Sequence, residues 1–188
     1  MSDSFYDCTG MSEEALRETF VSWDVELTDK SDLRYYHAIQ VRQCASLQMG
    51  ETVLDVGCGE CHLYDVLGDK VKGYVGVDID PRILKMAREK HPELDLRPGN
   101  IYDLSGLGVY DTVYAIGVYF NKPNLLLGVV KMLEHARLCV VMTYFTGSKR
   151  EPFPLLSGVE YDYLDFELDP ESTNTYIANL EIVRIRKK

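Results

Sequence analysis

The sequence predicts an α/β protein with a doubly wound, mostly parallel seven-stranded sheet, an antiparallel C-terminal strand pair and helices on both faces. Short apolar runs alternate with helical segments through the middle of the chain, which is typical of parallel strands joined by right-handed crossovers. After residue 158 this alternation stops and two strand-like runs follow one another. The length of 188 residues and the apolar content of 46% fit a single domain with a buried core.

Two helical segments come before the first strand. Residues 12–29 are predicted to be helical, because Ser12 suits the N-cap position and acidic residues follow it near the positive helix end. Residues 32–48 are predicted to form a second helix, whose apolar face would consist of Leu33, Tyr36, Ile39 and Leu47. We expect residues 1–48 to form an N-terminal helical cap over the pocket and residues 49–188 to form the core.

The core alternates strand and helix. Strands are expected at residues 52–56, 73–77, 94–97, 112–116 and 138–145. Helices are expected at residues 61–69, from Pro81 onward and at 123–136. The start at Pro81 is expected because proline favours the first helical position. Residues 147–158 contain two prolines and two glycines, too many for a helix. Residues 160–168 and 176–186 are expected to pair as antiparallel strands around Asp169-Pro170.

The composition restricts the class of partner. The formal net charge is −10 and the acidic residues are spread along the chain, so we expect a neutral or cationic small molecule rather than nucleic acid as the substrate. No apolar run is long enough for a membrane span, the first residues do not form a signal peptide, and five cysteines are an odd count. These features predict a cytoplasmic protein with free thiols that does not bind membranes. Disorder is expected only in the first ten residues and in the basic segment 184–188.

The residues that carry chemistry follow the first two strands. Val53–Val56 runs directly into Gly57 and Gly59, and such glycines allow a tight turn and a close approach of the backbone to a ligand. Asp78 ends the second strand, 21 residues after Gly57, about the 20-residue separation at which an acid meets a ribose hydroxyl. A carboxylate can accept a hydrogen bond from each of two hydroxyls.

Four segments in this order resemble the motifs of the class I S-adenosylmethionine (SAM)-dependent methyltransferases, a family with a Rossmann-like fold. They are Val53-Leu54-Asp55-Val56-Gly57-Cys58-Gly59, Gly76-Val77-Asp78-Ile79-Asp80, the segment 97–104 and the segment 110–118. The resemblance covers about residues 50–145. It implies SAM as the methyl donor and S-adenosylhomocysteine as the product.

The resemblance also implies a role for individual residues. Gly57 and Gly59 would line the methionine part of the cofactor, with Asp55 organising the turn. Asp78 would hold the ribose and Ile79 would pack on the adenine. The remaining implied contacts are the Asn100 side-chain oxygen with the adenine amino group, the Ile101 amide with a ring nitrogen, and the backbone around Ala115 and Ile116 with the cofactor's ammonium group.

The sequence departs from the family at two positions. The family often has a third glycine where this chain has Cys61, which predicts that the turn lies slightly further from the cofactor. The family commonly has Asp where Asn100 stands, which predicts modestly weaker adenine binding. A side chain of the helix before the first strand, such as Tyr35, is expected to touch the cofactor or the substrate.

Other interpretations of these motifs fit less well. A dinucleotide fingerprint needs glycine where His62 stands. Cys58-Gly59-Glu60-Cys61-His62 matches a haem-attachment or redox pattern, but it lies inside the cofactor turn. The four histidines are scattered and no acid ends the fourth strand, so we expect no metal ion.

The sequence therefore predicts transfer of a methyl group from SAM to a nitrogen or oxygen atom of a small molecule. It does not identify a catalytic base; the candidates are His37 and Tyr119, which follows the fourth strand. Two alternatives remain open: a non-catalytic SAM-binding subunit or activator of a partner enzyme, and a methyltransferase for protein side chains.

Overall fold

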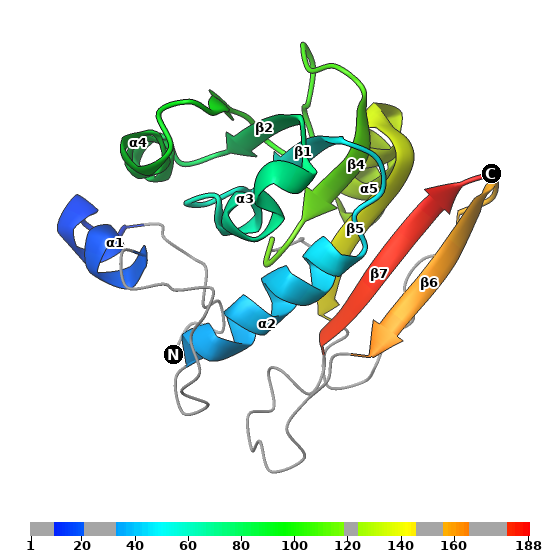
Figure 1. Ribbon diagram of the computed structural model, residues 1–188, viewed down its shortest axis with the longest axis horizontal. Helices are drawn as coiled ribbons and strands as arrows, with labels where there is room; N and C mark the ends of the chain where they lie inside the picture. Colours follow the sequence, from blue (N-terminus) through cyan, green and yellow to red (C-terminus); the bar gives the residue numbers. More distant parts are fainter. Residues whose placement is uncertain (1–9, 21–32, 119–123, 146–155, 166–179) are drawn as a thin grey trace.

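A seven-stranded sheet forms the centre of the computed structural model, which describes residues 10–20, 33–118, 124–145, 156–165 and 180–188. The strand order is β3-β2-β1-β4-β5-β7-β6 (Figure 1). The strands are β1 (Thr52–Val56), β2 (Gly73–Asp78), β3 (Asp95–Pro98), β4 (Tyr110–Ala115), β5 (Ala136–Phe145), β6 (Val159–Asp165) and β7 (Leu180–Lys187). Strands β1 to β5 are parallel, whereas β7 runs antiparallel to both β5 and β6. The predicted fold class is confirmed.

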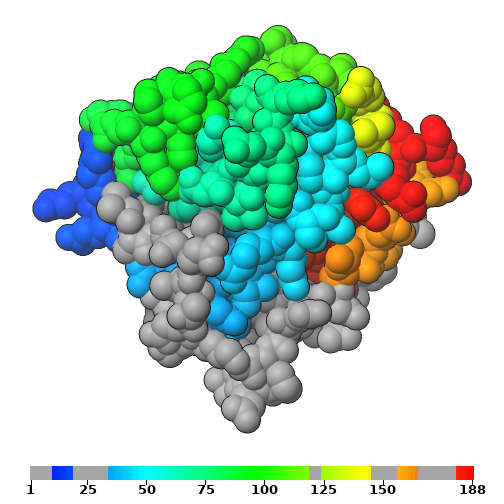
Figure 2. Space-filling model, in the orientation of Figure 1, coloured from blue at the N-terminus to red at the C-terminus, as the bar shows by residue number. Residues whose placement is uncertain are grey.

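Helices cover both faces of the sheet. They are α1 (Glu13–Phe20), α2 (Leu33–Ser46), α3 (His62–Leu67), α4 (Pro81–Lys90) and α5 (Leu125–His135), and a short 3₁₀ turn, η1 (Gly68–Lys70), follows α3. Side chains of α2, α3 and α4 belong to one buried cluster and those of α5 to another. Figure 1 shows α5 behind the sheet and the other three in front, and Figure 2 shows α2 beside α3 on this front face.

The central strands are mostly apolar because both of their faces are buried. In β1, Val53 packs in the cluster of α2 and α3, whereas Leu54 and Val56 pack in the cluster of α5. In β4, Tyr114 and Val113 divide between the two clusters in the same way. Side chains of successive strand residues point to opposite faces, so a sheet covered on both faces needs continuous apolar runs.

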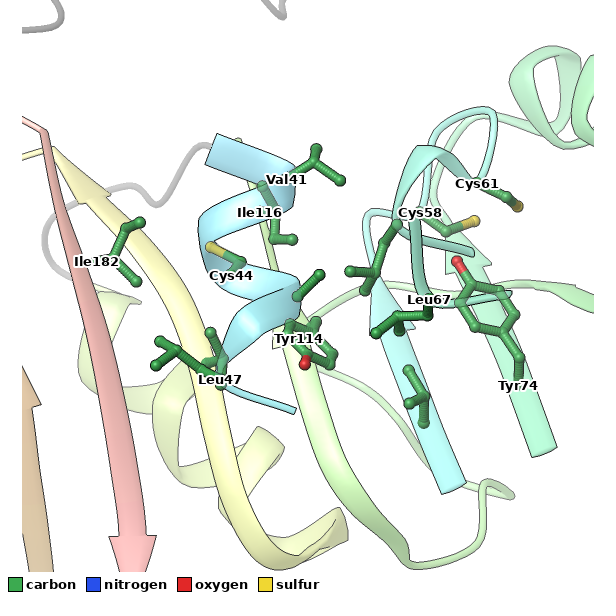
Figure 3. Close-up of a cluster of buried hydrophobic side chains, with 14 of the residues drawn as sticks. Val41, Cys44, Leu47, Cys58, Cys61, Leu67, Tyr74, Tyr114, Ile116 and Ile182 are labelled. Carbon is green, nitrogen blue, oxygen red and sulfur yellow. The ribbon is translucent and has the colours of Figure 1, made fainter. Parts of the chain in front are cut away.

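Helix α2 is part of the main core. Val41, Cys44 and Leu47 pack in the same cluster as Tyr114 of β4 and Ile182 of β7 (Figure 3). Helix α1 instead packs on α4, where Leu16 contacts Ile83 and Met86 in a small separate cluster. The proposed division into a cap (residues 1–48) and a core (residues 49–188) stays a prediction.

The start of the first predicted helix has the expected cap. The Ala15 amide donates to Ser12 Oγ at 3.1 Å, which satisfies one of the free N–H groups of the first turn. The described helix ends at Phe20, so the rest of the predicted segment 12–29 lies outside the described residues. Most of the segment 147–158 lies outside them as well.

The expectation of disorder in the basic segment 184–188 was wrong, since β7 continues to Lys187. Arg184 Nε and Arg186 Nε donate to Asp162 Oδ2 of the neighbouring strand at 2.9 and 3.0 Å, and Ile185 between them is fully buried. Asp162 and the burial of Ile185 therefore keep this segment ordered, although its sequence alone resembles that of a polar, disordered tail. Among the described residues, no helix has the length and apolar character that crossing a membrane requires.

Candidate functional site

A cavity of about 670 Å³ opens at the carboxyl ends of β1, β2 and β4. Its wall includes the segments 55–59, 78–83, 99–102 and 116–118, together with Gly10, His37, Val41, His62 and Leu63. This edge of an open parallel sheet is where such folds bind their ligands. The volume lies within the range of about 300–1,000 Å³ that is usual for small-molecule sites.

The turn after β1 has a geometry that requires glycine at position 57. Gly57 has a φ of +75°, and a Cβ atom placed on it would lie 2.5 Å from Val118 Cγ2. The amides of Gly57 and Cys58 both donate to the Val77 carbonyl, at 2.7 and 3.0 Å. The turn is thereby fixed to the end of β2. Gly59 has a φ of +54° with nothing within 4 Å of its Cβ position, so this part of the backbone is open to a ligand.

Cys61 occupies the position where the family often has a third glycine. Its φ is 67° and its ψ is 34°, a left-handed conformation, and its side chain is fully buried. Side chains of L-residues disfavour this region by about 1–2 kcal/mol, which explains the family's preference for glycine. The turn nevertheless closes, with the Cys61 amide donating to the Cys58 carbonyl at 2.8 Å.

Asp78 ends β2 and lines the cavity. Its Oδ2 accepts a hydrogen bond from the Gly59 amide at 3.1 Å, and its Oδ1 accepts one from the Asp80 amide at 2.9 Å. Burial raises the pKa of Asp78, and these backbone hydrogen bonds oppose the rise. Each carboxylate oxygen can accept a further hydrogen bond. Ile79 beside it is 71% exposed, an apolar side chain at the cavity wall.

Asp55 lies at the end of β1, and its Oδ2 accepts a hydrogen bond of 2.5 Å from the Tyr74 hydroxyl. Burial raises the pKa of Asp55 from 3.8 to about 7, the Tyr74 hydrogen bond opposes the rise, and the charge of Asp78 adds to it. Near neutral pH this cavity carboxyl group therefore exchanges between its neutral and charged forms.

The side of the cavity beyond β3 contains Asn100 and Ile101. Gly99 joins this segment to β2, because its amide donates to the Asp78 carbonyl at 3.0 Å. Asn100 Oδ1 accepts from the Tyr102 amide at 3.0 Å. The oxygen predicted to meet the adenine therefore already accepts one hydrogen bond and keeps one lone pair for another.

On the opposite side, Ile116, Gly117 and Val118 follow β4. The Gly117 amide donates to Thr143 Oγ1 of β5 at 2.8 Å, which holds this turn in place. Ala115 is fully buried in the core and is not among the lining residues.

Most of the residues predicted for the cofactor site meet at this one cavity, namely Asp55, Gly57, Gly59, Asp78, Ile79, Asn100, Ile101 and Ile116. Their binding roles stay predictions. Tyr35 is not among the lining residues; its ring packs edge-on against Tyr36 at 5.3 Å. His37 lines the cavity, and Tyr119 lies outside the described residues.

The sequence reasoning missed His62. His37 of α2 and His62, the first residue of α3, both line the cavity, and their ring centroids are 5.7 Å apart. Burial lowers the pKa of both rings, that of His62 to about 4. The available signal was that His62 directly follows the glycine turn. In the described part of the chain, His, Cys, Asp and Glu side chains do not gather in groups of three or more that could hold a metal ion.

The comparisons with known proteins agree with this geometry. A family model described as a methyltransferase domain matches residues 53–137. A tRNA U34 carboxymethyltransferase from Shewanella denitrificans is 35% identical over 107 residues, which are 53% of this chain and 31% of that protein. The chain thus spans about a quarter to a third of the length of the curated relatives that it matches.

Two solved structures share the fold. Magnesium protoporphyrin IX methyltransferase from Synechocystis, with bound S-adenosylhomocysteine, superposes with a TM-score of 0.68 at 17% identity and covers 98% of this chain and 96% of that one. The N-methyltransferase NodS from Bradyrhizobium japonicum has a TM-score of 0.61 at 13% identity, over 86% of this chain and 99% of that one.

These relatives correct the expectation about partners. A small-molecule substrate and no contact with nucleic acid were predicted, but the curated relatives are tRNA U34 carboxymethyltransferases. The prediction failed because a net charge of −10 is a sum over the whole chain and does not show where basic side chains gather on its surface.

The motif residues meet at the carboxyl edge of a mixed seven-stranded sheet, and the matching family model spans that same segment. The solved relatives extend the likeness of fold over nearly the whole chain. Residues 53–137 therefore match a methyltransferase-domain family, and the chain has the class I, Rossmann-like fold of SAM-dependent methyltransferases.

Proposed function

We propose that this chain binds SAM in the cavity and transfers its methyl group to a nucleoside of tRNA. The observation that carries the cofactor part is the position of Asp78, a half-buried carboxylate at the end of β2 that lines the cavity beside the glycine turn. The acceptor part is supported by the curated relatives, whose names specify tRNA.

The cavity wall fits the parts of SAM in order. Asp78 offers its remaining lone pairs to the two ribose hydroxyls, and the exposed Ile79 offers an apolar surface to the adenine. Gly57 and Gly59 leave room for the chain that joins adenosine to the amino-acid end. Asp55, in its charged form, is the complement of an ammonium group at that end.

When bound, SAM supplies a methyl group on a positively charged sulfur atom. The task of the protein is then to hold the donor and the acceptor in line, and such alignment can lower a barrier by several kcal/mol. Val41, Leu63 and Val118 give the cavity an apolar wall, which keeps water away from the reacting atoms. The turn of residues 116–118, tied to β5 through Thr143, lies where an acceptor would approach.

The test supplies labelled SAM and unmodified tRNA and then digests the RNA to nucleosides. We expect label in one nucleoside. Asp78→Ala should abolish labelling, whereas Asp95→Ala should preserve it, because Asp95 is an exposed residue of β3 that pairs with Arg97. The mass of the labelled nucleoside shows whether the group added is a methyl group.

Two results would contradict the proposal separately. If calorimetry shows that SAM binds but the RNA stays unlabelled, the acceptor is wrong. If SAM does not bind to the wild-type chain at all, the cofactor assignment is wrong. The affinity for tRNA should also fall with rising salt, because phosphate contacts release counterions.

A further inference from the structure

The two histidines of the cavity lie at the end away from the expected adenosine position. Helix α2 packs over β4, where Val41 and Ile116 belong to one buried cluster (Figure 3). His37 lies one turn before Val41 on this helix, and His62 opens the neighbouring helix α3. Asp78 and Asn100 follow β2 and β3, on the other side of β1 in the strand order.

The chemistry of the cofactor assigns a partner to this end. With the adenosine at Asp78, the amino-acid end of SAM extends across the glycine turn toward β4. That end carries a carboxylate, which requires hydrogen-bond donors or a positive charge. Among the described residues that line the cavity, the side chains able to carry a positive charge are His37, His62 and Arg82.

Arg82 is committed elsewhere. Its guanidinium donates to both carboxylate oxygens of Asp80, with Nε at 3.0 Å from Oδ1 and Nη2 at 2.5 Å from Oδ2, and Nη1 donates to the Met11 carbonyl at 2.5 Å. It also lies in the first turn of α4, on the β2 side of the cavity. The histidine pair is therefore the cationic candidate at the amino-acid end.

We propose that His37 and His62 together bind the carboxylate of SAM, and that this pair takes up a proton when the carboxylate enters the cavity. The inference rests on the proposed binding of SAM and goes beyond it, because it assigns the histidine pair as a carboxylate site and couples donor binding to pH.

The surroundings of the pair explain why the proton arrives with the ligand. In the free protein, burial keeps the pKa of both rings low, and the proximity of His62 opposes a charge on His37. The other charged groups that face the pair are Glu60, with Oε2 at 3.9 Å from His62 Nε2, and Asp65, Lys90 and His91, while Asp55 and Asp78 line the same cavity.

A bound carboxylate within hydrogen-bond distance favours the charged form of a histidine and raises its pKa. Between the low pKa of the free protein and the higher pKa of the complex, binding therefore takes up a proton. The affinity for ligands with this carboxylate should fall as the pH rises through that range.

The experiment compares SAM with decarboxylated SAM by titration calorimetry. The two ligands share the adenosine, the sulfonium and the ammonium group, so any proton exchange at Asp55 cancels in the comparison. We expect decarboxylated SAM to bind about tenfold to a hundredfold more weakly, as for the loss of a charged hydrogen bond. Titrations in buffers with different ionisation enthalpies should show greater proton uptake for SAM.

Variants assign the effect to the histidines. His37→Gln and His62→Gln retain a hydrogen-bond donor but cannot be protonated, so each should reduce the affinity ratio of the two ligands and remove the difference in proton uptake. Asn100→Ala is the control, because it alters the adenosine side. It should weaken both ligands together and leave their affinity ratio unchanged.

The outcomes separate this inference from the proposed function. Equal affinities for the two ligands with equal proton uptake would overturn the histidine assignment and leave SAM binding intact. Failure of SAM, decarboxylated SAM and adenosine to bind would overturn both. If a histidine variant does not fold, the affinities and the proton uptake of the two ligands on the wild-type chain still test the proposal.

Discussion

Cys61 is the one residue other than glycine that has a positive φ in the described part of the chain. Its conformation follows from the turn around Gly57 and Gly59, and its thiol is buried in the core below that turn. The residue thus combines an unfavourable backbone conformation with favourable burial. Substitutions of different size can separate these two contributions.

We predict that Cys61→Gly is more stable than Cys61→Ala by about 1 kcal/mol, although it removes more buried atoms, because only glycine adopts this conformation without strain. Denaturant unfolding of both variants measures the difference. Cys44, in the middle of helix α2, is the control, and there glycine should be less stable than alanine by about 1 kcal/mol. The same order of stability at both positions would contradict the prediction.

Asp55 gives a pH prediction. Its pKa is about 7 in the folded protein against 3.8 for the free group, so between these values the folded state binds more protons than the unfolded state. Stability from this group therefore falls as the pH rises through that window. From about pH 5 to about pH 8, the wild-type chain should lose roughly 1–3 kcal/mol relative to Asp55→Asn.

Denaturant unfolding at several pH values measures this difference in unfolding free energy. Tyr74→Phe should enlarge the loss of unfolding free energy between these pH values, because the Tyr74 hydrogen bond holds the pKa of Asp55 down. Parallel pH profiles for the wild-type chain and Asp55→Asn would show that Asp55 does not titrate in this range.

The meeting of Gly57 and Asp78 was predictable from spacing. Gly57 follows β1 and Asp78 ends the adjacent parallel strand β2, so both were expected at the same edge of the sheet. His62 was not predictable, because its partner His37 is brought to it by the packing of α2 on α3. The hydrogen bond from the Tyr102 amide to Asn100 was also hidden, because it depends on the conformation of the turn after β3.

At the scale of elements, the short strands were located well because burial on both faces gives them a continuous apolar pattern. The N-terminal helices were harder to place. Helix α1 packs on α4 through Leu16, whereas α2 is part of the main core. The sequence of each helix does not reveal which partner the helix covers.

Deleting residues 1–30 should abolish methyl transfer and leave the sheet folded. The deletion removes Gly10 from the cavity wall and α1 from the edge of α4, but it spares α2 and both main clusters. Circular dichroism and cooperative unfolding report the fold, and transfer of label reports activity. Leu16→Ala is a smaller change at the same contact, and it should weaken the packing of α1 on α4 by about 2–3 kcal/mol. Full activity of the truncated chain would exclude a covering role for this segment.

At the scale of the whole molecule, β7 lies between β5 and β6 in the sheet. Its side chains Ile182, Val183 and Ile185 are fully buried in the core. Arg184 and Arg186 of the same strand pair with Asp162. Local composition suggested that residues 184–188 are disordered, and only the sheet as a whole shows that they continue the predicted strand between β5 and β6. The acceptor was misjudged for a related reason, since a summed charge does not show where basic side chains gather on the surface.

Deleting residues 180–188 should prevent folding to a soluble monomer. The loss exposes the edge of β5 and leaves β6 without a neighbour, and unpaired apolar edges aggregate. Removing Lys188 alone, which lies beyond the strand, should have no measurable effect. Size-exclusion chromatography and thermal unfolding compare the two, and a soluble, cooperatively folding form of the longer deletion would refute the prediction.

The position of β7 also sets an order of assembly. Strand β6 is made before β7, yet β7 is its neighbour in the sheet. When the unfolded chain folds, β1 to β5 can pair with one another directly, but β6 can join the sheet only after β7 has paired with β5. A substitution that weakens the pairing of β7 with β5 would therefore prolong the interval in which β6 is open to pairing with another chain.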